Sequence, residues 1–499
     1  MVDIFLIKLE PDYKSYKIAP PFGILYLASA LEKEGFRVKL YHEKGTPKNI
    51  RFIVEDILNS HPLFVGFSTL TGPSLTPTLD ASRVLKRKLN IPVVWGGLHP
   101  TMLPEQTLNN DCIDLVVLGE GEETIVELAK VSAEKGLEPD ALKNIKAIAY
   151  RENGEIQTNP LRPFITNLDD YFPAWHHLNL EDYFYKGKYF YSEFGSKLPG
   201  DKIAAIITSR GCPWRCGYCY NQFVNKRSFR AHSAQRVISD IEWLKKSFNI
   251  SALAIEDDNF FTNKKRALEI IRNIGIPWES SIRANYVSQW GEDFIRELKE
   301  NNCVELRIGA ESGSQRILDI MHKDIIVEDI YKAVELCKKH NIRILFNFMI
   351  GIPGESWPEM LKTFQVMDEL EKKGNDIVVS GPSVYYPWPG TPLLDLAVEK
   401  GFNLPKRTEE WAVNWGPKQP TAPYVDKKVK FIGFYRISVF RKDLDSLKFP
   451  LFARLLRFVA KKRWEKRFFR FPIDYYIPRF FLNLIKALGL KKIAQAIYD

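Results

Sequence analysis

The sequence predicts an α/β protein in which a doubly wound, Rossmann-like sheet is followed by a partial (β/α)6 barrel and a helical C-terminal region. Short apolar strands alternate with helical stretches through residues 1–135 of the 499-residue chain. A second alternation, of six strand–helix units, begins at residue 203. From residue 405 the pattern changes to apolar and basic residues at helical spacing. A chain of this length is expected to hold two or three domains.

The first alternation contains five predicted strands that end in glycine-rich turns. They are expected at 4–9, 38–42, 64–69, 92–97 and 114–119, with helices between them, for example at 23–33 and 76–88. Ligands on such parallel sheets bind at the carboxyl ends of the strands, and glycine there permits close backbone approach. The candidate ligand-binding residues at these ends are Gly66, Ser68, Gly96, Gly97, His99, Gly119, Glu120 and Gly121. A nicotinamide cofactor is disfavoured because no Gly-x-Gly-x-x-Gly motif follows the first strand.

The second alternation predicts barrel strands at 203–209, 252–257, 279–284, 304–310, 343–350 and 376–386. Between the two alternations, Asn153-Gly154 is typical of a type I′ turn, which predicts a hairpin within residues 145–165. The domain boundaries that follow are 1–145, a hairpin and linker at 146–200, a barrel at 201–400, and a basic, aromatic region at 401–499. The chemistry of a barrel lies at the C-terminal ends of its strands.

Three cysteines follow the first barrel strand in the run Ser-Arg-Gly-Cys-Pro-Trp-Arg-Cys-Gly-Tyr-Cys-Tyr. Cys212, Cys216 and Cys219 have the spacing Cys-x3-Cys-x2-Cys. Three thiolates suit a cubane iron–sulfur cluster whose fourth iron stays open to another molecule. A structural zinc site normally has four protein ligands, and the next histidine along the chain is His232. A cluster is therefore favoured over a zinc site or free thiols.

The remaining composition is that of an intracellular protein. Cys112, Cys303 and Cys337 stand alone and are expected to pack as small hydrophobic residues, so no disulfide framework is predicted. The first residues lack the basic start and long apolar region of a signal peptide. No run of about 18 apolar residues occurs, so no spanning helix is expected. The expected location is the cytoplasm.

The cysteine run resembles the signature of radical S-adenosylmethionine (SAM) enzymes, and the aromatic Tyr218 before the last cysteine fits that signature. The resemblance implies that the three cysteines hold a [4Fe–4S] cluster and that the amino and carboxylate groups of SAM chelate its fourth iron. Reduction, by an external electron donor such as flavodoxin or ferredoxin, would cleave SAM to a 5′-deoxyadenosyl radical.

Polar residues after the later barrel strands resemble the SAM contacts of the same family. Asp257 and Asp258 would lie near the SAM ammonium group, although a helix N-cap would also explain acidic residues there. Arg283 resembles the arginine that contacts the methionine carboxylate, and Glu311 would accept from the ribose hydroxyls or the ammonium group. The remaining candidates are Ser312, beside Glu311, and Gly351 and Pro353, which would shape a turn against the adenine.

Residues 1–145 resemble the cobalamin-binding domain that precedes many radical SAM domains. The resemblance covers the runs at 20–27, 96–101 and 119–122. The Asp-x-His-x-x-Gly motif of proteins that ligate cobalt through a histidine is missing, so a weakly ligated or unligated lower face of cobalamin, near Leu70, is expected. The alternative is a flavodoxin-like domain without a cofactor.

The C-terminal region carries the excess positive charge of the chain. Residues 426–499 hold 19 Lys or Arg and 6 Asp or Glu, whereas the whole chain has a net charge of +10. Two amphipathic stretches, at 449–470 and 480–497, indicate helices that lie on an anionic membrane surface or grip a lipid-like substrate. A helical cap on the barrel with a solvated basic face is the alternative, and nucleic acid is disfavoured because no known binding module is visible.

The resemblance, which covers residues 1 to about 400, implies a cobalamin-dependent radical SAM enzyme and favours a C-methyltransferase. One SAM would methylate cob(I)alamin, a second would give the radical that abstracts substrate hydrogen, and the substrate radical would take the methyl group from methylcobalamin. The substrate is expected to be a small or lipid-like molecule. Radical cyclisation or rearrangement without methyl transfer is an alternative. A non-catalytic cobalamin or cluster sensor is a second, against which the full set of SAM contacts argues.

Overall fold

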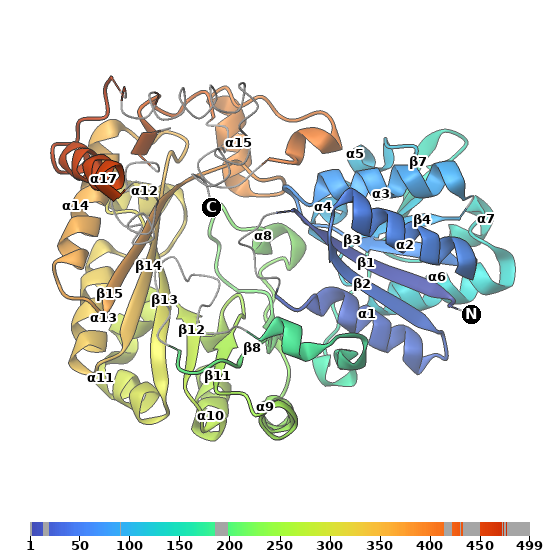
Figure 1. The fold of residues 1–499 in the computed structure, drawn as a ribbon, viewed down its shortest axis with the longest axis horizontal. Helices are drawn as coiled ribbons and strands as arrows, with labels where there is room; N and C mark the ends of the chain where they lie inside the picture. The colour runs from blue at the N-terminus through green and yellow to red at the C-terminus, as the bar shows by residue number, and fades with distance from the viewer. Residues whose placement is uncertain are drawn as a thin grey trace.

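A computed structural model describes residues 2–12, 19–89, 91–184, 198–413, 422–429, 431–432, 450–471, 473 and 476. The described chain forms two α/β bodies that lie side by side, with the N-terminal sheet on the right and the barrel on the left in Figure 1. The expected fold class is confirmed.

The N-terminal body is a seven-stranded sheet in the order β2-β1-β3-β4-β5-β6-β7. The first five strands in this order are parallel, and β1 pairs with both β2 and β3. The chain therefore reverses its direction of winding between β1 and β3, which is where doubly wound sheets bind ligands. The strands are β1 (Ile4–Glu10), β2 (Val38–Lys44), β3 (Phe64–Ser68), β4 (Val93–Gly96), β5 (Leu115–Val117), β6 (Ile148–Glu152) and β7 (Glu155–Thr158).

Helices cover both faces of this sheet because its strands are apolar on both sides. Buried residues of α1 and α6 pack in one hydrophobic core, and those of α2 and α3 pack in another that continues into the barrel. The helices are α1 (Phe22–Lys33), α2 (Pro47–Ser60), α3 (Leu75–Lys88), α4 (Leu98–Met102), α5 (Pro104–Leu108), α6 (Glu122–Lys135) and α7 (Pro139–Leu142).

The predicted hairpin is present as β6 and β7. Asn153 and Gly154 have φ angles of 53° and 85°, the left-handed pair that a type I′ turn requires. The hairpin pairs antiparallel with β5 and so extends the sheet at its far edge.

The barrel consists of six parallel strands in the order β15-β14-β13-β12-β11-β8, with β8 and β15 at its two edges. Every neighbouring pair is parallel, so all the carboxyl ends meet at one mouth. The strands are β8 (Ile203–Ile206), β11 (Ala252–Ile255), β12 (Trp278–Ile282), β13 (Cys303–Glu311), β14 (Arg343–Ile350) and β15 (Ile377–Val384). The helices are α8 (Asn221–Val224), α9 (Ala234–Phe248), α10 (Lys264–Ile274), α11 (Ala284–Glu300), α12 (Gln315–Ile320), α13 (Val327–Lys339), α14 (Trp357–Glu371) and α15 (Pro392–Glu399). A two-stranded ribbon, β9 (Ser209–Arg210) with β10 (Arg230–Ala231), flanks the mouth.

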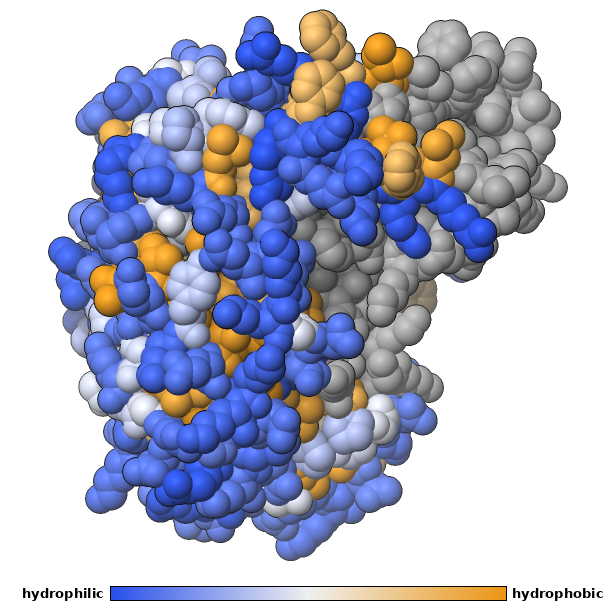
Figure 2. Space-filling view, turned by 90° about the vertical axis from the view of Figure 1, so that its left-hand side faces the viewer, coloured by the Kyte–Doolittle hydropathy of each residue, from blue (hydrophilic) through white to orange (hydrophobic). Residues whose placement is uncertain are grey.

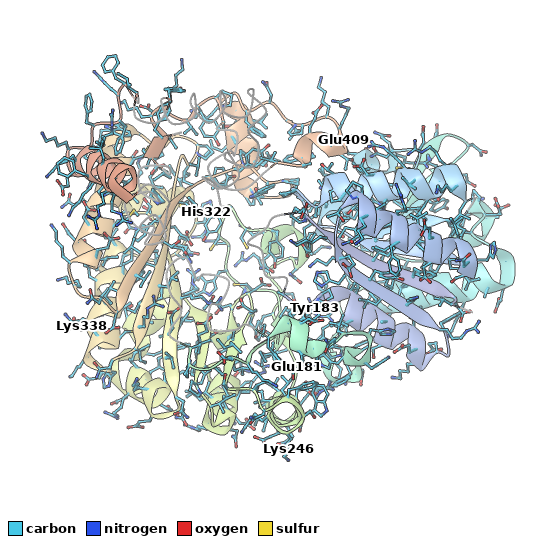
Figure 3. The ribbon with its side chains drawn as sticks, in the orientation of Figure 1. Glu181, Tyr183, Lys246, His322, Lys338 and Glu409 are labelled. Carbon is cyan, nitrogen blue, oxygen red and sulfur yellow. The ribbon has the colours of Figure 1, made fainter. Side chains whose placement is uncertain are left out.

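Two segments join the bodies, and both carry residues labelled in Figure 3. In the connector, the Tyr183 hydroxyl lies 3.0 Å from Nδ1 of His42 on β2, while Glu181 pairs with Lys202 just before the barrel at 2.7 Å. After the barrel, Glu409 pairs with Arg83 of α3. The two bodies are thus held together from both ends of the barrel sequence.

The helix α17 (Pro450–Glu465) lies against α14 at the outside of the barrel (Figure 1). Trp464 donates from Nε1 to Asp368 at 2.8 Å, and Arg467 pairs with the same carboxylate at 2.5 Å. This contact matches the expected helical cap for the first amphipathic stretch. The second stretch, at 480–497, lies outside the described residues.

Candidate functional site: a cysteine loop facing a glycine-lined cavity

The cysteine loop begins directly after β9, where only glycine fits. Gly211 has φ 81°, and a Cβ on it would lie 2.1 Å from the Ser228 carbonyl oxygen. Each cysteine sulfur then accepts one side-chain N–H: Cys212 from Asn259 at 3.6 Å, Cys216 from Arg283 at 3.5 Å, and Cys219 from Asn221 at 3.7 Å. Asn259 follows β11, Arg283 follows β12 and Asn221 begins α8. The loop therefore presents three thiols that already have polar partners.

The spacing of these sulfurs fits a multi-iron cluster better than a single metal ion. Zn–S bonds of about 2.3 Å would hold sulfur ligands within about 4 Å of one another. In the described part of the chain, the one group of three ligating side chains with donor atoms within 4.8 Å of one another is Glu32, His176 and His177. At least two of the three cysteine sulfurs are therefore more than 4.8 Å apart, which suits thiolates on separate irons. Burial raises the pKa of Cys212, and that of Cys219 to about 12, so both thiols stay protonated until a metal displaces the proton.

The Glu32 group itself lies in the N-terminal body and joins the connector to α1. Nε2 of His176 and Nε2 of His177 lie 3.1 Å and 2.7 Å from the same Glu32 oxygen. None of the three residues lines the cavity between the two bodies, which is described below.

Arg283 is held in place by several contacts at once. Its guanidinium stacks on Trp214 at 3.8 Å, donates to Asn285 at 3.2 Å, and donates to the Lys323 carbonyl. Trp214 is fixed in turn by a hydrogen bond to the Tyr286 hydroxyl at 2.9 Å. Arg283 therefore lies beside the cysteine loop, and its predicted contact with a methionine carboxylate stays a prediction.

Glu311 belongs to a buried triad at the end of β13. Its Oε1 accepts from the Tyr218 hydroxyl and from Lys323 Nζ, both at 2.9 Å, and Lys323 also donates to Tyr218 at 2.8 Å. Glu311 has φ 64°, a strained value that functional sites often retain. Gly309 makes room for the pair, because a Cβ there would lie 2.3 Å from the Glu311 carboxylate. Sequence reasoning assigned no role to Lys323.

The two adjacent aspartates have different surroundings. Asp257 is buried and accepts from the Thr208 backbone and from the Thr208 and Ser209 hydroxyls, so it braces the strand before the cysteine loop. Asp258 lines the cavity, where it accepts from Tyr220 at 2.7 Å and from the Gly211 amide at 3.3 Å. Of the two, Asp258 is the one available to a bound ligand.

The other predicted barrel residues are mainly structural in the described chain. Ser312 is fully buried and shares a 3.1 Å hydrogen bond with Thr363 of α14. Gly351 has φ 78° and packs against Val425, and the buried Pro353 follows it in the same turn. Their contact with an adenine stays a prediction.

A cavity of about 390 Å³ lies between the two bodies. Its N-terminal wall contains seven of the predicted ligand-binding residues, namely Gly66, Ser68, Gly96, Gly97, Gly119, Glu120 and Gly121. Its barrel wall includes Ser209, Arg210, Gly211, Tyr220, Glu256 and Asp258. The cavity thus connects the carboxyl ends of the N-terminal strands with the start of the cysteine loop.

The N-terminal wall fits a ligand that approaches the backbone closely, as a flat macrocycle would. A Cβ on Gly97, which has φ 99°, would lie 2.6 Å from the Thr69 carbonyl oxygen. A Cβ on Gly66 or Gly121 would lie 3.1 or 3.0 Å from a leucine side chain. A side chain at Gly97 would collide with the loop after β3, and one at Gly66 or Gly121 would press on a leucine of the cavity lining, so the shape of this wall depends on glycine.

Two predicted residues lie behind this wall rather than in it. His99 is fully buried, shares a 3.0 Å hydrogen bond with Thr71, and has its pKa lowered to about 3 by burial. It is therefore a neutral imidazole that supports the loop after β3. Leu70, in that loop, is 38% exposed and lies outside the cavity lining. The described part of the connector does not line this cavity either; Pro173 and Trp175 border a small one next to it.

An ionic network that the sequence did not predict borders the cavity. Glu120 accepts from Arg210 at 2.9 Å and from Arg230 at 2.6 Å, and Arg210 also pairs with Glu122 at 2.6 Å. The Arg210 guanidinium lies 4.9 Å from the Tyr26 ring. The network joins β9 and β10 to the N-terminal sheet. Arg210 directly precedes Gly-Cys in the cysteine run, which was the available signal.

Family models match both bodies. Residues 206–367 match the Radical SAM superfamily and residues 13–129 match the B12 binding domain. The chain is 31% identical over 446 residues to an uncharacterized methyltransferase of Pyrococcus horikoshii, which covers 85% of this chain and 90% of the relative. It is 25% identical over 403 residues to an anaerobic magnesium-protoporphyrin IX monomethyl ester cyclase of Cereibacter sphaeroides, covering 78% of this chain and 63% of that one.

A solved structure has the same arrangement of domains. The radical SAM methyltransferase TsrM of Kitasatospora setae, solved with cobalamin and a [4Fe–4S] cluster bound, aligns with a TM-score of 0.61 and 17% identity. The alignment covers 81% of this chain and 76% of TsrM. At 17% identity this similarity supports only the fold, whereas the family is supported by the sequence matches.

Proposed function

This chain belongs to the cobalamin-dependent radical SAM enzymes, and from that premise we propose that it transfers a methyl group to an unactivated carbon of a small, lipid-like substrate. The observation that carries the proposal is the shared cavity. Glycine-lined strand ends and the start of the cysteine loop border the same space, so two cofactors can face one substrate.

When bound, the cluster and cobalamin supply the radical and methyl-transfer chemistry, and the protein supplies binding and orientation. Cys212, Cys216 and Cys219 are the residues that would hold the cluster. Asp258, at the cavity, can accept from a cationic ammonium group, and the ionic network keeps the two walls in register. An external one-electron donor such as flavodoxin or ferredoxin would complete the system.

Radical cyclisation without methyl transfer is the second candidate. It is favoured by the similarity to the magnesium-protoporphyrin ester cyclase, which spans 78% of this chain. The same cavity and cysteine loop would serve either reaction, so the products must distinguish them.

The test is anaerobic reconstitution of the full chain with iron, sulfide and hydroxocobalamin, followed by reduction with SAM present. Methyl transfer predicts both S-adenosylhomocysteine and 5′-deoxyadenosine, because one SAM donates a methyl group and another is cleaved. Deoxyadenosine alone, in the presence of a substrate that is consumed, would contradict methyl transfer and support cyclisation.

We further propose that the C-terminal region contacts an anionic membrane surface, where a lipid-like substrate would be found. Ala460, Trp464 and Phe469 are buried against the barrel, whereas Phe458 is 59% exposed and Phe471 is 75% exposed. Exposed basic residues lie in the same segment, among them Arg454, Lys461, Lys462, Lys466 and Arg470. Figure 2, which looks onto this side of the barrel, has hydrophobic residues among hydrophilic ones at its upper edge. Exposed aromatic rings beside lysine and arginine are typical of interfacial helices. No helix in the described ranges is long and apolar enough to cross a membrane.

This proposal predicts sedimentation with vesicles of phosphatidylglycerol and weak sedimentation with phosphatidylcholine. The double variant Phe458→Ser, Phe471→Ser should lose most of that binding. Phe52→Ser, which changes a 61% exposed ring on α2, is the matched control and should bind as the unaltered protein does. Equal loss in both variants, or no loss in either, would overturn the proposal and leave α17 as a barrel cap.

A further inference from the structure

A continuous hydrogen-bonded path connects the cavity to one cluster cysteine. Arg230 donates from Nη1 to Glu120 at 2.6 Å and from Nη2 to Oδ1 of Asn225 at 3.0 Å. Asn225 donates from Nδ2 to Oδ1 of Asn221 at 2.6 Å, and Asn221 donates from Nδ2 to Cys219 Sγ at 3.7 Å. Glu120 and Asn225 line the cavity, whereas Arg230 and Asn221 are buried.

The path fixes which end of each amide points toward the sulfur. Arginine can only donate, so Asn225 must present its oxygen to Arg230 and its NH2 group to Asn221. Asn221 must then accept with its oxygen, which leaves its own NH2 group for Cys219. Glu120 holds the guanidinium at the start of the path and is itself held by Arg210 and by the Ile165 amide. The donor to Cys219 is thus set by a carboxylate of the other body.

We propose that the orientation of the side-chain donor to Cys219 is set by a relay of four residues, namely Glu120, Arg230, Asn225 and Asn221. Through this relay, a change in what the cavity holds alters the reduction potential of the cluster. Hydrogen bonds to cluster sulfurs are among the features that set such potentials. A donor stabilises the added negative charge of the reduced cluster, so losing it lowers the potential. Because Glu120 and Asn225 border the cavity, a ligand bound there acts on the relay directly. The inference rests on the two cofactors and not on the reaction proposed above.

The other two thiols provide an internal comparison. Asn259, the donor to Cys212, contacts the Tyr286 hydroxyl rather than any relay residue, and Arg283, the donor to Cys216, is held by barrel residues. Only the Cys219 donor, among the described contacts of the three sulfurs, leads to the N-terminal body. The proposal therefore concerns the hydrogen bond to Cys219 alone, and the hydrogen bonds to Cys212 and Cys216 serve as internal controls.

The experiment is a redox titration of the reconstituted full chain, with the cluster followed by electron paramagnetic resonance, with and without hydroxocobalamin. Asn225→Asp is the decisive variant, since it keeps the size and the Arg230 contact but cannot donate to Asn221. Asn221 should then turn its NH2 group to Asp and withdraw it from Cys219. We expect reduction to become at least about threefold less favourable, or about 28 mV at 59 mV per tenfold change.

The control is Asn259→Leu, which removes the donor to Cys212 but leaves the relay intact. Its potential should also fall, while the difference between cobalamin-loaded and cobalamin-free protein should remain as in the unaltered chain. In Asn225→Asp that difference should disappear, and adding Asn221→Leu should lower the potential no further. An unchanged potential in Asn225→Asp, or a cobalamin-dependent difference that persists there, would overturn the proposal. Iron content, measured alongside, identifies any variant that fails to assemble the cluster, and Asn225→Leu, which also cannot donate to Asn221, then replaces it.

Discussion

The two walls of the cavity are built in opposite ways. The N-terminal wall combines glycines at the strand ends with apolar side chains such as Leu6, Leu27 and Val117. The barrel wall is made of polar side chains that already bond to one another, as Asp258 does with Tyr220. The first wall makes room for a large ligand and the second holds reactive groups in fixed positions. Substitutions in the two walls are therefore expected to affect different cofactors.

The largest expected effect is on the barrel half. Cys216→Ala removes one of the three thiols that we propose hold the cluster, so the protein should lose most of its iron and all reductive cleavage of SAM. Cobalamin binding should survive, because Cys216 does not line the N-terminal wall. Iron analysis and the visible spectrum measure both. Cys337→Ala, in the core of α13, is the control and should keep its iron; retained SAM cleavage by Cys216→Ala would contradict the site.

Gly97→Ala should instead weaken cobalamin binding by the N-terminal body. The new Cβ would lie 2.6 Å from the Thr69 carbonyl oxygen, so the loop after β3 must move and cobalamin binding should fall by more than tenfold. Gly35→Ala has the same kind of positive φ but meets nothing within 4 Å, so it should cost stability alone. Comparable cobalamin loss in both variants would show that backbone strain, and not the shape of the cavity, is responsible. Iron content should be normal in each.

Gly309→Ala tests the buried triad of Glu311, Tyr218 and Lys323 within the barrel. Its Cβ would meet the Glu311 carboxylate at 2.3 Å and Lys323 Nζ at 2.8 Å, which must separate the triad. We expect SAM affinity to fall about tenfold, roughly 1.4 kcal/mol, with the cluster retained. Equilibrium dialysis with SAM measures this. A Cβ at Gly354 would meet no atoms within 4 Å, so Gly354→Ala serves as the control. An unchanged affinity for SAM in Gly309→Ala would show that Glu311 does not take part in SAM binding.

The smallest expected effect is a pH dependence at Glu355, in the turn after β14. Burial raises the pKa of this carboxyl to about 7, although the Gly351 and Ile352 amides donate to it. The folded chain then binds more protons than the unfolded chain between pH 4.5 and 7. Stability is therefore present at low pH and lost as pH rises through that window. Glu355→Gln should remove the loss, so its melting temperature should exceed that of the unaltered protein by a few degrees at pH 8 and not at pH 5. If Glu355→Gln and the unaltered protein differed in melting temperature by the same amount at pH 5 and pH 8, the raised pKa of Glu355 would be contradicted.

The positions of most strands along the chain, the hairpin at Asn153-Gly154, the three-cysteine run and most of the glycines that line the cavity could be predicted from sequence alone. These follow from local rules, since strand periodicity, turn geometry and ligand spacing are all properties of neighbouring residues. Tertiary structure alone decided that His99 and Asp257 are buried supports, while Asp258 faces the cavity. It also decided that Lys323 completes the Glu311 triad and that Glu120 reaches Cys219 through the relay. These contacts join residues far apart in sequence, so no local pattern encodes them. They exist because packing brings two bodies, and the ends of separate strands, to one cavity.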